Sequence, residues 1–429
     1  MPIQVSLVVL LWVFSPITAT LRAFFELPRF ELDLVRGTLA LLAILLLLRR
    51  EFVRGGLSEL VRSFLLELPR RAPLFSSVLA LFVVSLASSS RPLLTAWRLV
   101  GLATMVALGV YLARRLDTDQ LCRLLLRALV PLLLASVLVA LLVPEFGQHL
   151  NRPRAAIDGA WRGVLGHRNG LGPAATITVL AAVALLPGTA RDSWSRPPIA
   201  VLWAMLGLFV LYQSGSFTAL AMVVVGLLVL ALGRVGGGRP RLQVAGLAVF
   251  GGLVVVALLH HESFFALFGR DSTLSGRTIL WKKSLEFIEL RPLVGHGYGL
   301  SWPEVPALAS QLEVLDRPWQ RSFHSGYLAA AFWAGWPALV LLMVALLRAL
   351  VALGRRWLAG GTVLAPAFPL ALLAALLVLA VSETRLLLHA HFFTALLCAM
   401  VLRAQGMNPT MMSSQDSTDF TQGAGDGNG

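Results

Sequence analysis

Apolar runs, each about as long as a helix that crosses a bilayer, recur along the whole sequence and limit its fold more than any other feature. The chain is 57% hydrophobic and 14% charged, and that charge is well below the roughly 25% of soluble domains. The sequence therefore predicts an all-α polytopic integral membrane protein.

We predict twelve spans, which together make residues 1–403 a single transmembrane domain. The first run begins at Ile3, with no basic segment before it and no small-residue cleavage site, so we interpret it as a retained span. The tail 404–429 is rich in Ser, Thr, Asp, Asn and Gly, which predicts disorder. The predicted spans are 4–21, 33–49, 72–89, 93–113, 121–143, 171–187, 198–212, 216–233, 243–260, 327–352, 363–381 and 386–403.

The net charge of +14 comes largely from arginines in the short loops of one side. This bias predicts a cytoplasmic N-terminus and places two longer loops, 144–170 and 261–326, on the outer side of the membrane. Nucleic acid is not an expected partner, because no basic domain stands apart from the spans. Cys122 and Cys398 lie inside apolar runs, so neither a disulfide framework nor a zinc site is expected.

The loop 261–326 is the long polar interval of the sequence, and its length indicates a function. Within it, Trp281, Leu285 and Ile288 recur at helical spacing, which predicts a short amphipathic helix. The candidate N-caps of that helix are Ser272, Thr273 and Ser275.

Arg277 would then lie in the first turn of this helix, where free backbone N–H groups favour an anion. Its guanidinium suits a diphosphate, which it can bind through paired hydrogen bonds. The alternative is a surface salt bridge from Arg277 to Asp271 or Glu304.

The second outer loop ends on a group of donors immediately before a span: Arg162, His167, Arg168 and Asn169. Donors at the membrane interface suit a phosphate headgroup, and simple interfacial anchoring is the alternative. Arg98 lies near the outer end of the fourth span. We expect it either to line a cavity for a lipid diphosphate or to snorkel to the interface.

Several other patterns are excluded as sites. The pair Asp117 and Asp119 lies in a short turn without a nucleotide-binding domain. The glycines of 295–299 have the wrong spacing for a dinucleotide fingerprint and predict a compact turn. His389 and His391 point to different faces of a helix, and the outer loops have no acidic or histidine cluster with ligand spacing. We therefore expect no metal and no cofactor.

Three motifs taken together resemble the O-antigen ligase and polymerase superfamily, most closely its exopolysaccharide polymerase branch. The first two are Gly269-Arg-Asp-Ser-Thr-Leu-Ser-Gly-Arg-Thr-Ile-Leu-Trp281 and Arg291-Pro-Leu-Val-Gly-His-Gly-Tyr-Gly299. The third is a family pattern that His324, Ser325 and Gly335 match, with Ala338 at its last position as a departure. The segment Val164-Leu-Gly-His-Arg-Asn169 is similar to a further outer-loop motif of the family.

The resemblance implies a metal-independent inverting glycosyltransferase of the bacterial inner membrane, with its active site facing the periplasm. It implies an undecaprenyl-diphosphate-linked glycan as donor, a glycan or lipid-linked acceptor, surrounding membrane lipid, and a flippase and a chain-length regulator as candidate partners. In this interpretation Arg277 and His324 are catalytic. The candidate substrate-binding residues are Arg270, Arg162, Arg168, Asn169, Lys282, Arg321 and Arg98.

Three functions stay open at this point. Ligases of the family commonly have an arginine after the serine of the turn before the eighth span, whereas this turn reads Gln213-Ser-Gly-Ser-Phe217. That departure favours a polymerase of lipid-linked repeat units over a ligase that moves glycan to lipid A-core. A polysaccharide-related transporter is the third possibility, although the sequence shows no internal repeat of the kind such transporters have.

Overall fold

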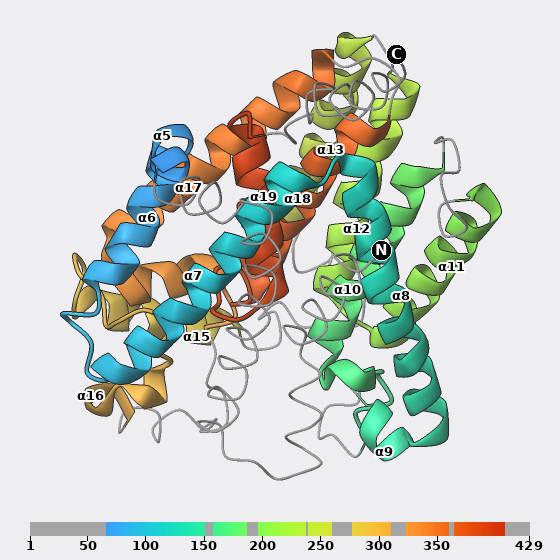
Figure 1. Cartoon of the computed structure of the whole chain (residues 1–429). Coiled ribbons are helices and arrows are strands. Elements are labelled where there is room, and N and C mark those ends of the chain that lie inside the picture. Colours follow the sequence, from blue (N-terminus) through green and yellow to red (C-terminus); the bar gives the residue numbers. More distant parts are fainter. Residues whose placement is uncertain are drawn as a thin grey trace, which may run out of the picture.

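The computed structural model describes residues 66–150, 158–186, 196–236, 239–259, 277–309, 323–359 and 364–407. These residues form helices joined by turns, and an isolated bridge between Gln148 and Trp161 is the β-type pairing among them (Figure 1). The all-α prediction therefore holds for the described part of the chain.

The described helices fall into the helices of a bundle and further helices at its two ends (Figure 1). The bundle helices are α6 (Pro73–Val84), α7 (Pro92–Arg115), α8 (Thr118–Leu142), α10 (Arg168–Leu185), α11 (Pro197–Ser214), α12 (Phe217–Val235), α13 (Pro240–Leu259), α17 (Gly326–Ala359), α18 (Leu364–Ser382) and α19 (Phe392–Ala404). The further helices are α5 (Leu68–Arg71), α9 (Pro144–Gly147), η2 (Gly163–Leu165), α15 (Arg277–Glu289), η4 (Trp302–Glu304) and α16 (Pro306–Ala309).

Ten predicted spans coincide with these bundle helices, and the spans 4–21 and 33–49 lie outside the described residues, as does the tail from residue 408. Five described helices are long and apolar enough to cross a membrane: α7, α8, α11, α12 and α17. The described chain is thus that of a membrane protein, and the count of twelve spans stays a prediction.

The last predicted span, 386–403, is wrong at its beginning. The helix α19 begins only at Phe392, where His391 caps it by accepting a hydrogen bond from the Phe393 N–H at Nδ1. The preceding residues form turns, with Leu387 and Ala390 at positive φ. Apolar side chains of this irregular segment are buried among neighbouring helices. The segment is therefore as hydrophobic as a membrane span, and hydropathy alone cannot distinguish the two.

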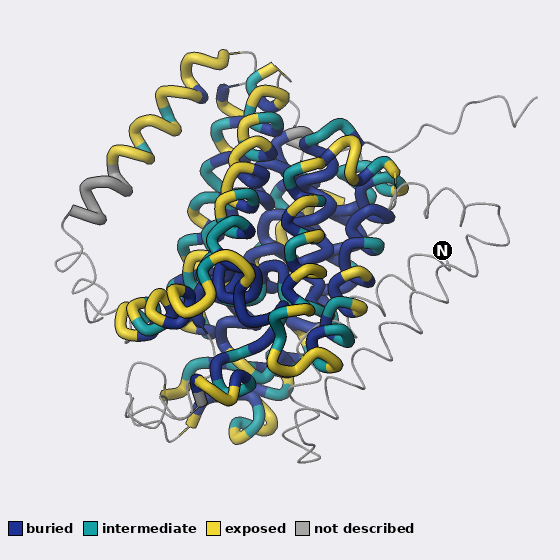
Figure 2. Tube along the Cα trace, turned by 90° about the vertical axis from the view of Figure 1, so that its left-hand side faces the viewer, coloured by how far each residue is buried: buried dark blue, intermediate teal, exposed yellow. Residues whose placement is uncertain are grey.

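The centre of the bundle is α10, whose residues are almost all buried between α8, α11, α12 and α18. Figure 2 shows the buried segments concentrated in the middle of the molecule, with exposed residues along its periphery. The described residues of α13 are mostly exposed, apart from Gln243. Its first residue, Pro240, follows closely on α12.

The helix α17 is interrupted ten residues after His324, where Ala334 and Gly335 leave helical geometry. Gly335 has φ of 81°, and a Cβ there would lie 2.5 Å from the Leu293 carbonyl carbon. The segment 292–297 packs into this break and satisfies its backbone: His296 N–H donates to Phe332 O at 2.8 Å, and Trp336 N–H donates to Pro292 O at 2.7 Å. The outer loop and α17 therefore form one unit.

The predicted compact turn at 295–299 is confirmed, since Gly295, Gly297 and Gly299 all have positive φ. The turn is anchored to the end of α6 and to the segment between α18 and α19. The Tyr298 N–H donates to Ser85 Oγ at 2.9 Å, and the Tyr298 hydroxyl donates to Leu387 O at 2.6 Å. These contacts hold the loop against the same end of the bundle at which α15 begins.

Candidate active site

The candidate site is built around a carboxylate, Glu383, immediately after α18. It is 6% exposed. Asn169 Nδ2 donates to its Oε1 at 2.6 Å, and Arg277 Nη2 lies 3.0 Å from the same oxygen. Arg385 Nε is 3.6 Å from Oε2, and His324 Nδ1 is 3.8 Å from Oε1. The beginnings of α10, α15 and α17 therefore meet at the end of α18.

This cluster determines the charge of its central carboxylate. Burial alone raises the pKa of Glu383, but contact with His324 and the positive charges of Arg385 and Arg277 outweigh burial and lower the pKa to about 2. Glu383 is therefore ionised at neutral pH. It acts as a fixed negative charge that orients its cationic neighbours, and it is a poor proton acceptor.

His324 reaches the cluster through an unusual backbone conformation. Its φ of 48° is in the left-handed region, which an L-residue adopts at a cost of roughly 1 kcal/mol or more. Trp281 Nε1 donates to the His324 carbonyl at 3.4 Å, and Ser325 Oγ accepts from the Leu328 N–H at 3.4 Å to cap α17. These contacts explain the motif locally, because the serine begins the helix and the histidine before it turns toward Glu383.

The beginning of α10 is held by a neutral histidine. His167 Nδ1 accepts from the Asn169 N–H at 3.1 Å. Desolvation by the surrounding protein, and then the charge of Arg385, lower the pKa of His167, although part of the residue is exposed at the surface. Asn169 Oδ1 accepts from Ser216 Oγ at 3.3 Å, which directs its amide nitrogen toward Glu383.

The side chain of Arg168, the first residue of α10, reaches the turn in which ligases of the family commonly have an arginine. Its Nη1 donates to Gly215 O at 3.2 Å, between α11 and α12. The tight turn predicted at 213–215 is confirmed, with Gly215 at φ of 55°. The turn has no arginine of its own in sequence, but a guanidinium from α10 occupies it in space.

Two other predicted arginines bind the protein itself. Arg162 Nε donates to Phe146 O at 2.9 Å and so ties its loop to α9. Arg98 makes a two-point contact with Glu304, at 2.9 Å from Nη1 to Oε2 and 2.7 Å from Nη2 to Oε1. Arg98 Nη1 also donates to Gly299 O at 2.8 Å. Arg98 thus joins α7 to the outer loop, and its role toward substrate stays a prediction.

The predicted outer-loop helix is confirmed as α15, which begins at Arg277. Its buried face agrees with the predicted stripe only in part. Ile288 is buried together with Leu280, Ser284 and Phe287, whereas Leu285 is exposed and Trp281 is half-buried. Lys282 is exposed on this helix, and Arg270, Arg321, Asp271 and the candidate caps Ser272, Thr273 and Ser275 lie outside the described residues.

The structure therefore brings together Arg277, His324 and Asn169, three of the residues selected from sequence. Arg277 pairs with Glu383, which was not among the predicted partners. Of those two, Glu304 pairs with Arg98, and Asp271 lies outside the described residues. Sequence reasoning did not select Glu383 or Arg385 as site residues. The available signal was an ionisable pair between two apolar runs, which is expensive near a membrane and commonly functional.

No group of three His, Cys, Asp or Glu side chains within the described ranges could hold a metal ion. The cluster itself is dominated by cations around one carboxylate. Such a donor set suits an anion that displaces or shares the carboxylate, and diphosphate has the charge and oxygen geometry for guanidinium pairs.

Comparison with known sequences places this geometry in a family. Residues 200–343 match the family described as O-antigen ligase. This stretch is similar to the O-antigen ligase family. It runs from α11 into α17 and contains Arg277 and His324, whereas Asn169 and Glu383 lie on either side of it. The resemblance to the O-antigen ligase and polymerase superfamily is confirmed.

A curated relative of this O-antigen ligase-like chain is the exopolysaccharide production protein ExoQ of Rhizobium meliloti (strain 1021). The two are 34% identical over 109 residues, which is 24% of this chain and 25% of ExoQ. The chain thus matches about a quarter of the length of that relative.

Proposed function

We propose that this protein is a membrane glycosyltransferase that uses an undecaprenyl-diphosphate-linked glycan as donor. It polymerises repeat units of an O-antigen or exopolysaccharide on the periplasmic side of the inner membrane. The convergence of Arg277 and His324 on Glu383 is the observation that carries this proposal. The similarity to the O-antigen ligase family and to an exopolysaccharide production protein supports the substrate class.

In this reaction the acceptor hydroxyl oxygen attacks the anomeric carbon, and the bond from that carbon to the diphosphate oxygen breaks. Arg277 stabilises the departing diphosphate, because one face of its guanidinium is held by Glu383 while its side chain is still 19% exposed. Its place at the first residue of α15 adds free backbone N–H groups to the same region. A single displacement of this kind inverts the anomeric configuration and needs no metal.

His324 takes the proton of the acceptor hydroxyl. Glu383, held ionised by its surroundings, stabilises the imidazolium that then forms. Asn169 supports Glu383 from the opposite side and keeps the carboxylate in place between transfers. His324 thus acts on the proton of the acceptor, and Arg277 acts on the leaving group of the donor.

Ligation to lipid A-core is the second candidate, and two observations favour it. The matching family is described as O-antigen ligase. Arg168 also brings a guanidinium to Gly215, so the turn is less different from that of ligases than its sequence indicates. The polymerase remains the primary proposal because the curated relative is named for exopolysaccharide production.

The catalytic assignment is tested with purified protein, a lipid-diphosphate donor, and separate assays for donor binding and transfer. We expect His324→Ala to lower transfer by about 10²–10⁴-fold while donor binding persists. Arg277→Ala should impair transfer severely, and Arg277→Lys should restore only part of it, because lysine cannot make the paired contact. Near wild-type transfer by His324→Ala, or joint loss of stability and binding, would contradict the assignment.

The choice between polymerase and ligase is tested in a strain that lacks the gene. Accumulation of single repeat units on lipid indicates a polymerase. Long polymer that is not joined to lipid A-core indicates a ligase. Complementation with His324→Ala should leave either phenotype unchanged, whereas complementation with the wild type should remove it.

A further inference from the structure

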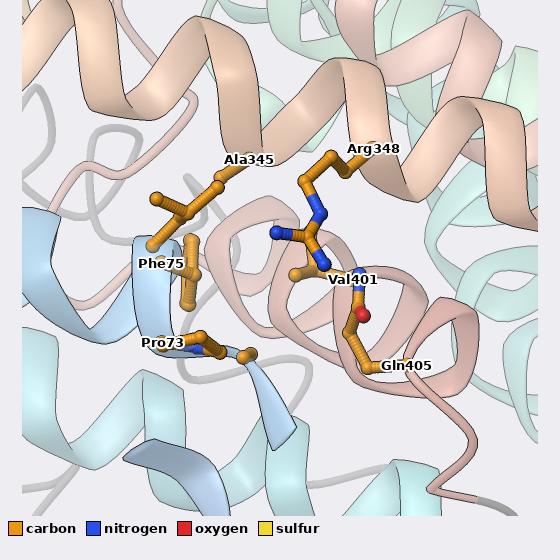
Figure 3. A pocket seen from close by; sticks show the side chains of 8 residues that line it. Pro73, Phe75, Ala345, Arg348, Val401 and Gln405 are labelled. Atoms are coloured by element: carbon orange, nitrogen blue, oxygen red, sulfur yellow. The ribbon is translucent and has the colours of Figure 1, made fainter. Parts of the chain in front are cut away.

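The end of the bundle opposite the candidate active site contains a crevice between α6, α17 and α19 (Figure 3). Phe75, Ala345 and Val401 form its apolar walls, and Arg348 and Gln405 are its polar side chains. Figure 3 shows the Arg348 side chain extending from α17 toward Gln405 and Val401 of α19. About 18 Å of uninterrupted helix separates Arg348 from the break in α17.

Arg348 is exposed on the surface of a helix that is long and apolar enough to cross a membrane. Within the described part of the chain, Arg348 has no carboxylate at ion-pair distance. A cation at the edge of a bilayer is costly unless it meets water or a lipid phosphate. Its exposed position therefore leaves the guanidinium accessible to a lipid phosphate.

Further positive charge gathers beside the crevice at Gly406, which follows Gln405. Arg71 Nη1 donates to Gly406 O at 3.3 Å, and Arg356 Nη1 donates to Arg403 O at 2.5 Å. Among the described carboxylates, Glu67 lies 3.8 Å from Arg71 Nε and 3.7 Å from Arg114 Nη1, and the charge of Asp117 acts on Arg403. The described part of this region holds more guanidinium groups than carboxylates, so its local charge is positive.

The surface of α17 around Arg348 is apolar and exposed. Met343, Val344, Leu347 and Val351 are each between 41% and 59% exposed. Such a stripe beside a cation matches the two parts of a phospholipid, since the phosphate meets the guanidinium and the acyl chains lie along the stripe. A soluble phosphate ion would make no use of the stripe.

We propose that this crevice binds the headgroup of an anionic phospholipid. Arg348 contacts the phosphate, Gln405 donates to a headgroup oxygen, and the acyl chains lie along the exposed face of α17. The site is independent of the proposed transfer reaction, because it lies at the other end of the bundle and shares no residue with the cluster around Glu383.

The test is native mass spectrometry of the full-length protein in neutral detergent, titrated with phosphatidylglycerol or with phosphatidylcholine of the same acyl chains. We expect the wild type to prefer phosphatidylglycerol and Arg348→Gln to weaken that binding about fivefold. The matched control is Arg355→Gln, which removes the same charge from an exposed position of α17 outside the crevice. It should change the affinity less than twofold.

A second variant keeps Arg348 in place. Gln405→Glu preserves the shape of the side chain and adds a carboxylate beside the guanidinium, so it should weaken phosphatidylglycerol binding as well. Equal losses in Arg348→Gln and Arg355→Gln would overturn the proposal and leave only general surface charge. Equal binding of both lipids, or displacement of phosphatidylglycerol by millimolar inorganic phosphate, would also overturn it.

Discussion

At the scale of single residues, Glu383 allows a change of charge with almost no change of shape. Glu383→Gln removes the negative charge between Arg277 and Arg385 and leaves the imidazolium of His324 without its counter-charge. We expect transfer to fall about 10²–10⁴-fold while the lipid-diphosphate donor still binds. Transfer and donor binding by the purified variant measure this directly.

The control for that change is Glu67→Gln, which neutralises a carboxylate at the opposite end of the bundle. It should transfer at the wild-type rate. Unchanged transfer in Glu383→Gln would show that the carboxylate serves only the fold, and loss of donor binding in that variant would contradict the division of roles.

The protonation of His167 and Glu383 predicts how stability depends on pH. The pKa of His167 is lowered from its ordinary value of 6.5, so below pH 6.5 the unfolded chain binds more protons at this site than the folded protein does. Glu383 has a pKa lowered from 4.5 to about 2, so its contribution is present above pH 4.5 and is lost as the pH falls toward 2. Stability should therefore decrease steadily from pH 6.5 downward.

Thermal unfolding in detergent at pH 7, 6 and 5 measures the first part of this decrease, where Glu383 does not yet titrate. His167→Asn should flatten the slope in that range, because asparagine caps a helix well and carries no titrating group. A wild-type midpoint that does not change with pH, or an unaltered slope in His167→Asn, would contradict the assignment of a lowered pKa to His167.

At the scale of elements, the break in α17 depends on two glycines that face each other. A Cβ on Gly295 would lie 2.4 Å from Ala334 N, and a Cβ on Gly335 would lie 2.5 Å from the Leu293 carbonyl carbon. Both residues also have positive φ. Gly335→Ala should therefore destabilise the protein by more than the roughly 1–2 kcal/mol of the left-handed backbone alone.

Gly251→Ala is the matched control, because Gly251 lies within α13 and a Cβ there meets nothing within 4 Å. It should stabilise the protein by up to about 1 kcal/mol, as alanine does in a helix interior. Thermal midpoints of the two variants provide the comparison. Equal midpoints would show that the loop moves aside and that the break is not a fixed feature.

At the scale of the whole molecule, arginines gather at one end of the bundle and the candidate active site lies at the other. The ends of α5, α7 and α17 carry Arg71, Arg115 and Arg356, whereas α9 and α15 lie at the far end (Figure 1). The positive-inside rule predicts that the arginine-rich end is cytoplasmic. A cysteine at Asp158 should then react with a membrane-impermeant thiol reagent in intact cells, and one at Arg355 should not.

Cys122 and Cys398 are buried and make little background in this experiment. The two engineered positions are both exposed, so their reactivity after lysis should be similar. Labelling at Arg355→Cys in intact cells would reverse the orientation and place the candidate site in the cytoplasm.

Hydropathy and motifs together predicted ten described helices, the compact turn at 295–299 and the pairing of Arg277 with His324 in one site. They could not predict the late beginning of the last helix, because a buried irregular segment is as apolar as a helix. They also missed Glu383, whose importance comes from the three helix termini that meet it and not from any pattern around it. The pairing of Arg98 with Glu304 joins residues far apart in sequence, and no local rule links them.

The break in α17 has a consequence for exchanging parts between relatives. The peptide groups left open by Ala334 and Gly335 are closed by residues 292–297, so each half of this joint is incomplete without the other. In a hybrid that receives residues 292–297 from a relative but keeps its own α17, the foreign backbone would have to form the same hydrogen bonds with the break. We expect chimeras with crossover points before 290 and after 338 to assemble, and those with a crossover between these positions to fail.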